Sequence, residues 1–167
     1  MKMRAGEAMA GTGANRVHIN LLIGDREGPV GHAFAMALAS PRPGHIPFLV
    51  VLQPNVPVRP ATLFVNKAEI REGLHAEISW GAGEAGMAQG IRDAIKAGAL
   101  SAYHLDDLVI IASIWIDWEA TDGAAVLNNT REAMRLALLR VDGKESYAAD
   151  FLDDSLDAFN SMFEMRE

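Results

Sequence analysis

The most apolar run of the chain is the nine-residue stretch Leu-Val-Ile-Ile-Ala-Ser-Ile-Trp-Ile at 108–116. A membrane-spanning helix needs about 20 consecutive apolar residues, so this run is too short to cross a bilayer. Isoleucine and valine supply more than half of it, and β-branched side chains favour extended backbone. The run therefore predicts the central strand of a sheet, around which the rest of the domain must be built.

The composition limits the classes of protein to which the chain can belong. Its 167 residues are 50 % hydrophobic, which suffices for one compact domain with a core. The net charge is −7 and no cluster of lysine and arginine stands out, so nucleic acid is not an expected partner. The absence of cysteine excludes disulfides and thiolate catalysis. No apolar stretch has the length of a membrane helix or a signal peptide, so we expect a soluble protein of the cytoplasm.

Strand-like and helix-like segments follow one another along the chain, which predicts a two-layer α+β domain. The expected strands are 17–23, 48–52, 62–65, 108–116 and, from the alternation of Leu74, Ala76, Ile78 and Trp80, a further one within 71–80. The expected helices begin at Pro29 and cover 84–97 and 122–140. The glycines at 11 and 13 predict a turn that leads into the first strand, and Gly98 predicts the end of the second helix.

The last 26 residues differ in charge from the rest of the chain. Residues 142–167 hold eight acidic and two basic side chains, a net of −6. The apolar residues Leu152, Leu156, Phe159 and Phe163 keep helical spacing, which is typical of an amphipathic helix. We therefore divide the chain into a domain at 1–141 and an acidic, helical tail at 142–167 that packs on its own domain or on a neighbouring subunit.

His18 and Lys67 are two candidate functional side chains, each of which also has an ordinary structural interpretation. His18 lies within a predicted strand between Val17 and Ile19, and an imidazole titrates near neutral pH. It acts either as a proton donor or as an ordinary strand histidine with one hydrogen bond. Lys67 follows a predicted strand and is either solvated, in contact with an anionic ligand, or a nucleophile towards a carbonyl. The five histidines show no spacing of a metal pair, so no metal is expected.

Several ordered segments of residues 5–141 resemble the formaldehyde-activating enzyme family. They are Glu-Ala-Met-Ala-Gly-Thr-Gly at 7–13, Val-His-Ile-Asn-Leu-Leu-Ile-Gly at 17–24, Gly-Pro-Val at 28–30, Ala-Phe at 33–34, Pro-Asn-Val-Pro-Val-Arg-Pro-Ala-Thr-Leu at 54–63, Asn-Lys at 66–67, Asp-Leu-Val-Ile-Ile-Ala-Ser-Ile-Trp-Ile at 107–116 and Trp-Glu-Ala at 118–120. The resemblance implies a two-layer α/β sandwich with a left-handed βαβ crossover. It also implies a cytoplasmic homopentamer that binds the pterin between subunits.

The activity that the resemblance implies is the condensation of formaldehyde with tetrahydromethanopterin, a hydro-lyase reaction of one-carbon metabolism, methylotrophy and formaldehyde detoxification. The pterin is a co-substrate. The resemblance makes His18 the proton donor and places Leu49 and Lys67 against the ligand. Three further ligand positions depart from the family pattern. They are Asn20 where the family has Asp, Glu69 where it has Thr, and Glu84 where it has Gln.

These departures change charge more than size, and they leave three hypotheses open. The first is a divergent paralogue that still performs the condensation, with His18 as general acid. The second is a non-catalytic paralogue that binds or senses a pterin or its one-carbon adduct. The third is an enzyme on the same scaffold whose ligand is more cationic, which the added carboxylates would favour.

Overall fold

The computed structural model describes residues 1–71 and 73–142, and within them it is a mixed α+β domain with a five-stranded mixed sheet. The predicted tail at 142–167 lies outside the described residues except for its first residue, Asp142, at which α4 ends. The strands are β1 (Arg4–Ala10), β2 (Val17–Asp25), β3 (Phe48–Leu49), β4 (Val51–Gln53), β5 (Val56–Pro57), β6 (Ala61–Asn66) and β7 (Leu108–Ile116). The helices are α1 (Pro29–Leu38), α2 (Leu74–Glu77), α3 (Glu84–Lys96) and α4 (Gly123–Asp142), with a π-helical turn at Ile78–Gly83 between α2 and α3.

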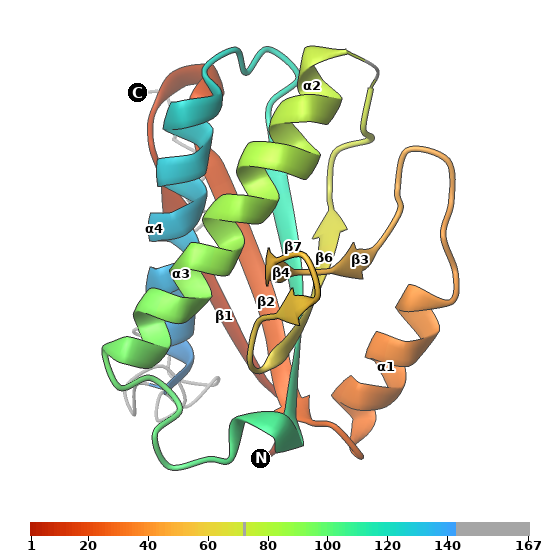
Figure 1. The fold of residues 1–167 in the computed structure, drawn as a ribbon, viewed down its shortest axis with the longest axis vertical. Coiled ribbons are helices and arrows are strands. Elements are labelled where there is room, and N and C mark those ends of the chain that lie inside the picture. The colour runs from red at the N-terminus through yellow and green to blue at the C-terminus, as the bar shows by residue number, and fades with distance from the viewer. Residues whose placement is uncertain (72, 143–167) are drawn as a thin grey trace, which may run out of the picture.

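The main sheet has the order β1-β2-β7-β6-β3, so the apolar run at 108–116 is its central strand, as predicted (Figure 1). β7 pairs antiparallel with β2 and parallel with β6. The parallel pair is joined through α2, the π-helical turn and α3, which together form a βαβ unit. β4 and β5 form a separate two-stranded hairpin beside α3.

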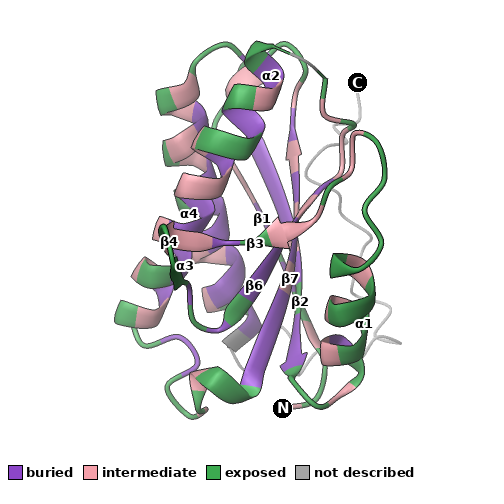
Figure 2. Ribbon diagram, turned by 45° about the vertical axis from the view of Figure 1, so that its right-hand side comes forward, coloured by how far each residue is buried: buried purple, intermediate pink, exposed green. Residues whose placement is uncertain are grey.

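Helices α3 and α4 cover one face of the sheet, and the core lies between them and the strands (Figure 2). Alternate residues of β7 point into this core, among them Ile110 and Ile114, and Met87 and Ile91 of α3 meet them from the helix side. Glycine lets the two helices approach closely. A Cβ added at Gly86 or Gly90 would lie only 2.8 Å from the Cβ of Thr130 or Met134 on α4.

In the part of the chain that the structure describes, α1 is the one helix on the opposite face of the sheet, and it packs near the end of β2. Val30 of α1 contacts Gly24, and it is the one buried residue of that helix. The rest of α1 is partly or fully exposed, although its sequence is largely apolar; Met36 is 57 % exposed. Among residues 1–71 and 73–142, no other helix covers the remainder of this face along β1, β2 and β7, where Glu7 and Leu22 are exposed (Figure 2).

The structure corrects the prediction of a strand within residues 71–80. Gly73 adopts a positive φ of 74°, and from Leu74 the chain is helical. The buried residues His75, Ile78 and Ser79 are three and four positions apart, so they form one helical face. Ile78 belongs to both the alternating and the helical pattern, and that ambiguity made the strand interpretation wrong.

Two further strands differ from expectation. The expected strand at 48–52 is divided at Val50, so that β3 joins the main sheet while β4 joins the hairpin. β1 was not predicted, because its sequence Arg-Ala-Gly-Glu-Ala-Met-Ala is poor in β-branched and aromatic residues. Its pairing with β2 and the packing of Gly6 against Val141 of α4 hold it at the sheet edge.

No helix among the described residues has the length and apolar character to cross a membrane.

Candidate active site

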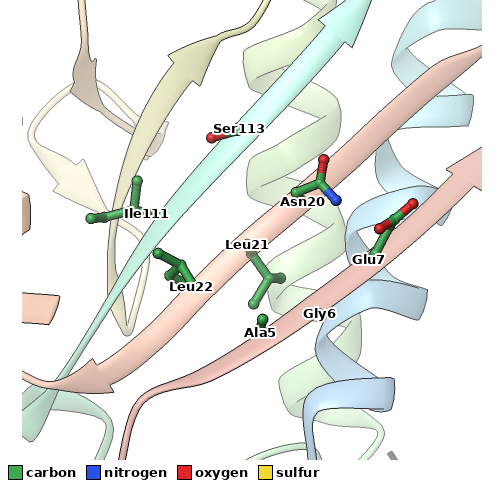
Figure 3. A pocket seen from close by; sticks show the side chains of 8 residues that line it. All are labelled: Ala5, Gly6, Glu7, Asn20, Leu21, Leu22, Ile111 and Ser113. Carbon is green, nitrogen blue, oxygen red and sulfur yellow. The ribbon is translucent and has the colours of Figure 1, made fainter. Parts of the chain in front are cut away.

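A pocket of about 360 Å³ opens on the sheet face opposite α3 and α4. Its lining comes from three neighbouring strands, β1, β2 and β7 (Figure 3). Strand alternation turns Glu7, Asn20 and Ser113 to this same face, and the ladders place Glu7 and Ser113 directly opposite Asn20 on either side. Leu22 and Ile111 supply an apolar floor beside these polar groups.

Four side chains at this face form a continuous hydrogen-bonded chain. The His18 Nε2 atom lies 2.7 Å from Glu7 Oε1, and its Nδ1 atom lies 3.2 Å from the Lys67 ammonium nitrogen. Lys67 also donates a hydrogen bond to the amide oxygen of Asn20. The order is therefore Glu7, His18, Lys67, Asn20, with a carboxylate at one end and a neutral amide at the other.

The charge of Lys67 fixes the tautomer of His18. An ammonium group can only donate, so the His18 Nδ1 atom must accept from it. The ring proton then sits on Nε2 and is donated to Glu7, as the 2.7 Å distance allows. In this arrangement both nitrogens of the imidazole are engaged, and His18 itself is nearly buried.

Burial lowers the pKa of Lys67 from 10.5 to about 8, and the nearby Glu7 carboxylate opposes this shift. Asn20 accepts the second hydrogen bond of Lys67, and an amide supplies no negative charge. The lysine is therefore charged at neutral pH but is a much stronger acid than a solvated one.

Lys67 reaches its partners by crossing over the central strand. It follows β6, whereas His18 and Asn20 lie on β2, and β7 separates those two strands in the sheet. On the face of β7 between these strands, Ser113 is opposite Asn20 and Trp115 is opposite His18. A side chain larger than serine at position 113 would therefore lie beside the contact between Lys67 and Asn20.

The other predicted ligand residues lie apart from this chain of hydrogen bonds. Leu49 is exposed on β3 opposite Leu63, on the edge strand of the sheet. Glu69 lies against the loop at Gly44, and its carbonyl accepts from the Trp118 indole at 3.0 Å. Within the described residues, neither side chain forms a hydrogen bond with His18 or Lys67.

Glu84 begins α3 and is turned toward the β4–β5 hairpin. Its carboxylate accepts a hydrogen bond of 2.7 Å from the backbone N–H of Val51. Partial burial raises the pKa of Glu84, and the Val51 hydrogen bond opposes that rise. The Glu84 carboxylate is therefore engaged by the hairpin and does not supply His18 or Lys67 with the negative charge that the family resemblance would place at position 20.

Glu7 is the site residue to which sequence reasoning assigned no role. It lies within one of the segments that carry the family resemblance, but the strand that places it opposite Asn20 was not predicted. Once β1 and β2 are recognised as a hairpin, the register brings its carboxylate to His18.

Among the described residues, no group of three or more His, Asp or Glu side chains is arranged to hold a metal ion.

Comparison with known proteins gives a consistent result over most of the chain. Residues 5–160 match the family model described as "Formaldehyde-activating enzyme (Fae)". A protein of Methanosarcina barkeri named 5,6,7,8-tetrahydromethanopterin hydro-lyase is 41 % identical over 140 residues, which cover 84 % of this chain and 79 % of that protein.

Two longer relatives carry the name "Bifunctional enzyme Fae/Hps". The protein of Methanosphaerula palustris is 40 % identical over 135 residues, covering 81 % of this chain and 34 % of its own length. The protein of Methanococcoides burtonii is 38 % identical over 142 residues, covering 84 % of this chain and 36 % of its own length. This chain therefore spans about a third of each bifunctional relative.

Proposed function

Because this chain belongs to the formaldehyde-activating enzyme family, we propose that it condenses formaldehyde with tetrahydromethanopterin or a related reduced pterin. The observation that carries the proposal is the hydrogen-bonded pair of His18 and Lys67 beside an open pocket, in a chain of this family. The product is the methylene derivative, and water leaves.

The chemistry needs a proton at one step. A ring amine of the pterin adds to formaldehyde and gives a carbinolamine, whose hydroxyl group is a poor leaving group. Protonation of that oxygen releases water and leaves an iminium ion, which the second, aryl-amine nitrogen then captures. General acid catalysis of the dehydration is worth about 10²–10⁴-fold. Holding both nitrogens near the one-carbon unit adds effective molarity.

In this proposal, different residues provide acid catalysis and ligand binding. The pair His18–Lys67 supplies the acid, and the family resemblance assigns the proton donor to His18. Asn20 and Lys67 contact the pterin at the pocket, Leu49 offers it an apolar surface, and Glu69 and Glu84 bind its more distant parts. Since Leu49, Glu69 and Glu84 lie away from His18 in the single chain, their contribution fits a pocket shared between neighbouring subunits.

The assembly that we propose is a homopentamer of about 90 kDa from chains of 18.0 kDa, located in the cytoplasm. Helix α1 supports an assembly, because a largely apolar helix with only one buried residue leaves apolar surface for another protein chain. We also propose that the βαβ unit from β6 to β7 has the left-handed sense of the family's two-layer sandwich.

A non-catalytic pterin-binding protein is the second candidate. The observation that favours it is the engagement of both His18 ring nitrogens, by Glu7 and by Lys67. A histidine held in this way has no N–H directed at a substrate. Such a paralogue would bind the reduced pterin or its one-carbon adduct without accelerating the condensation.

Condensation of formaldehyde with tetrahydromethanopterin, followed by absorbance with and without the protein, tests the proposal. We expect acceleration over the spontaneous reaction, a loss of about 10²-fold or more in His18→Ala, and no loss in His104→Ala, whose histidine is exposed and does not line the pocket. A wild-type protein that binds the pterin but leaves the rate at its spontaneous value would support the binding protein instead.

A further inference from the structure

The Lys67 ammonium group has one more donor than its partners use. It carries three N–H groups, of which one goes to His18 Nδ1 and one to the Asn20 amide oxygen. Within residues 1–71 and 73–142 the third N–H has no acceptor. Lys67 is half-buried, and its ammonium group lies beside Asn20, which lines the pocket, so this N–H can meet a bound molecule.

His18 has no such donor in the same arrangement. Its one ring proton is held by the Glu7 carboxylate, and its other nitrogen accepts from Lys67. Its side chain is only 11 % exposed, whereas that of Glu7 is 50 % exposed. A proton could leave His18 towards a substrate only if one of its two hydrogen bonds were broken first.

We propose that Lys67 is the catalytic residue that protonates the leaving hydroxyl group, and that His18, anchored by Glu7, is the positioning residue that aims it. This inference rests on the proposed condensation and assigns the proton within the His18–Lys67 pair. The Glu7 carboxylate holds the imidazole in one tautomer, and the imidazole nitrogen and the Asn20 amide hold the ammonium group between them.

The step balances within the site. The C–O bond of the carbinolamine breaks, its electron pair leaves with the hydroxyl group, and one N–H proton of Lys67 completes the water molecule. The products are the iminium ion, water and a neutral lysine. The aryl-amine nitrogen then forms the new C–N bond and loses its proton, which restores the ammonium group. No oxidant, reductant or further reactant is needed.

The charges around Lys67 suit this role. Glu7 and His18 are the titratable groups joined to it on β1 and β2, and Ser113 and Trp115, on the same face of β7, are uncharged. A general acid works best when its pKa lies near the working pH, and burial brings the pKa of Lys67 to about 8. A carboxylate in place of Asn20 would stabilise the ammonium form and make it a weaker acid.

The test is the pH profile of the catalysed rate, after subtraction of the spontaneous reaction. In wild type we expect the rate to fall above an apparent pKa near 8, because the ammonium form is then lost. Asn20→Asp should move this alkaline limb upward by about one pH unit or more. Asn55→Asp makes the same charge change in the exposed β4–β5 turn and should leave the limb in place.

Lys67→Arg is the second variant, because it keeps the positive charge but does not release a proton at these pH values. We expect kcat to fall by about 10²-fold or more while KM for the pterin changes little. An alkaline limb that stays fixed in Asn20→Asp, or a Lys67→Arg variant with wild-type kcat, would overturn the role of Lys67 alone. A wild-type protein without any condensation would overturn the proposed function and this inference together.

Discussion

The close contact between α3 and α4 gives a sharp prediction about stability. Gly86 and Gly90 lie one helical turn apart on the face of α3 that meets α4. A Cβ added at either position would lie 2.8 Å from a Cβ of α4, where ordinary contacts begin at 3.4 Å, and a backbone carbonyl of α4 would be nearer still. Since a backbone carbonyl cannot rotate away, the two helices must separate.

The size of the effect is set by two opposing contributions. Overpacking of a core contact costs about 1–3 kcal/mol. Alanine in place of a helical glycine returns about 0.8–1.0 kcal/mol of helix propensity. Because the added Cβ would lie 2.4 Å from a backbone carbonyl oxygen, the upper end of the overpacking range applies, and we expect Gly86→Ala and Gly90→Ala each to lower the free energy of unfolding by about 2 kcal/mol. The double variant should lose less than the sum, because one displacement of α4 relieves both contacts.

Urea denaturation followed by circular dichroism measures these differences, and each 1 kcal/mol corresponds to about 2–4 °C in Tm for a chain of this size. Gly81→Ala is the matched control, because Gly81 is exposed and an added Cβ there meets nothing within 4 Å. We expect the control to be neutral or stabilising. A Gly86→Ala variant as stable as wild type would refute the argument that the helices cannot separate cheaply.

Three further predictions concern the site and its surroundings. Because burial raises the pKa of Glu84, its contribution to stability is present in acid and is lost as the pH rises through that raised value. Glu84→Gln, which can still accept the hydrogen bond from the Val51 N–H, should therefore match wild type near pH 4 and be at least as stable near pH 7. Urea midpoints at the two pH values measure this difference. Because the folded pKa of Lys67 is lowered from 10.5 to about 8, the unfolded chain binds more protons between these pH values, and the free energy of unfolding should rise with pH there. Lys67→Met should remove this rise. An identical slope of the free energy of unfolding against pH in wild type and variant would contradict the prediction. Ser113→Leu should block the path of Lys67 over β7 and lower kcat in the condensation assay without lowering Tm by more than a few degrees, whereas unchanged kcat would show that the lysine takes another route.

The parts of the fold that sequence analysis predicted are those in which one pattern dominates. The apolar run at 108–116 had the composition of a central strand, and α3 begins and ends within a residue of its expected limits because Met87, Ile91 and Gly98 mark its face and its end. β1 could not be predicted, since its alanines and glycines carry no local strand signal and only the ladder with β2 makes them extended.

The site residues also divide into those that a sequence pattern identifies and those that depend on strand pairing. His18, Asn20 and Lys67 were predicted from the family resemblance, and the structure brings these three together. Glu7 was missed because its position depends on the register of the unpredicted strand. The direction of Glu84 was equally inaccessible, since its partner is a backbone N–H in a hairpin whose geometry depends on the break at Val50.

The placement of β7 between β2 and β6 has a consequence for the order in which the site can form during synthesis of the chain. Glu7 and His18 are 11 residues apart on a hairpin, so they can meet soon after they leave the ribosome. Lys67 can join them only when residues 108–116 have been made and inserted between the two strands, because before then nothing holds β6 beside β2. A nascent chain can thus form its histidine–carboxylate pair early but acquires its amine only with the last strand of the sheet, so the lysine of lowered pKa is not assembled until all five strands of the sheet have been made.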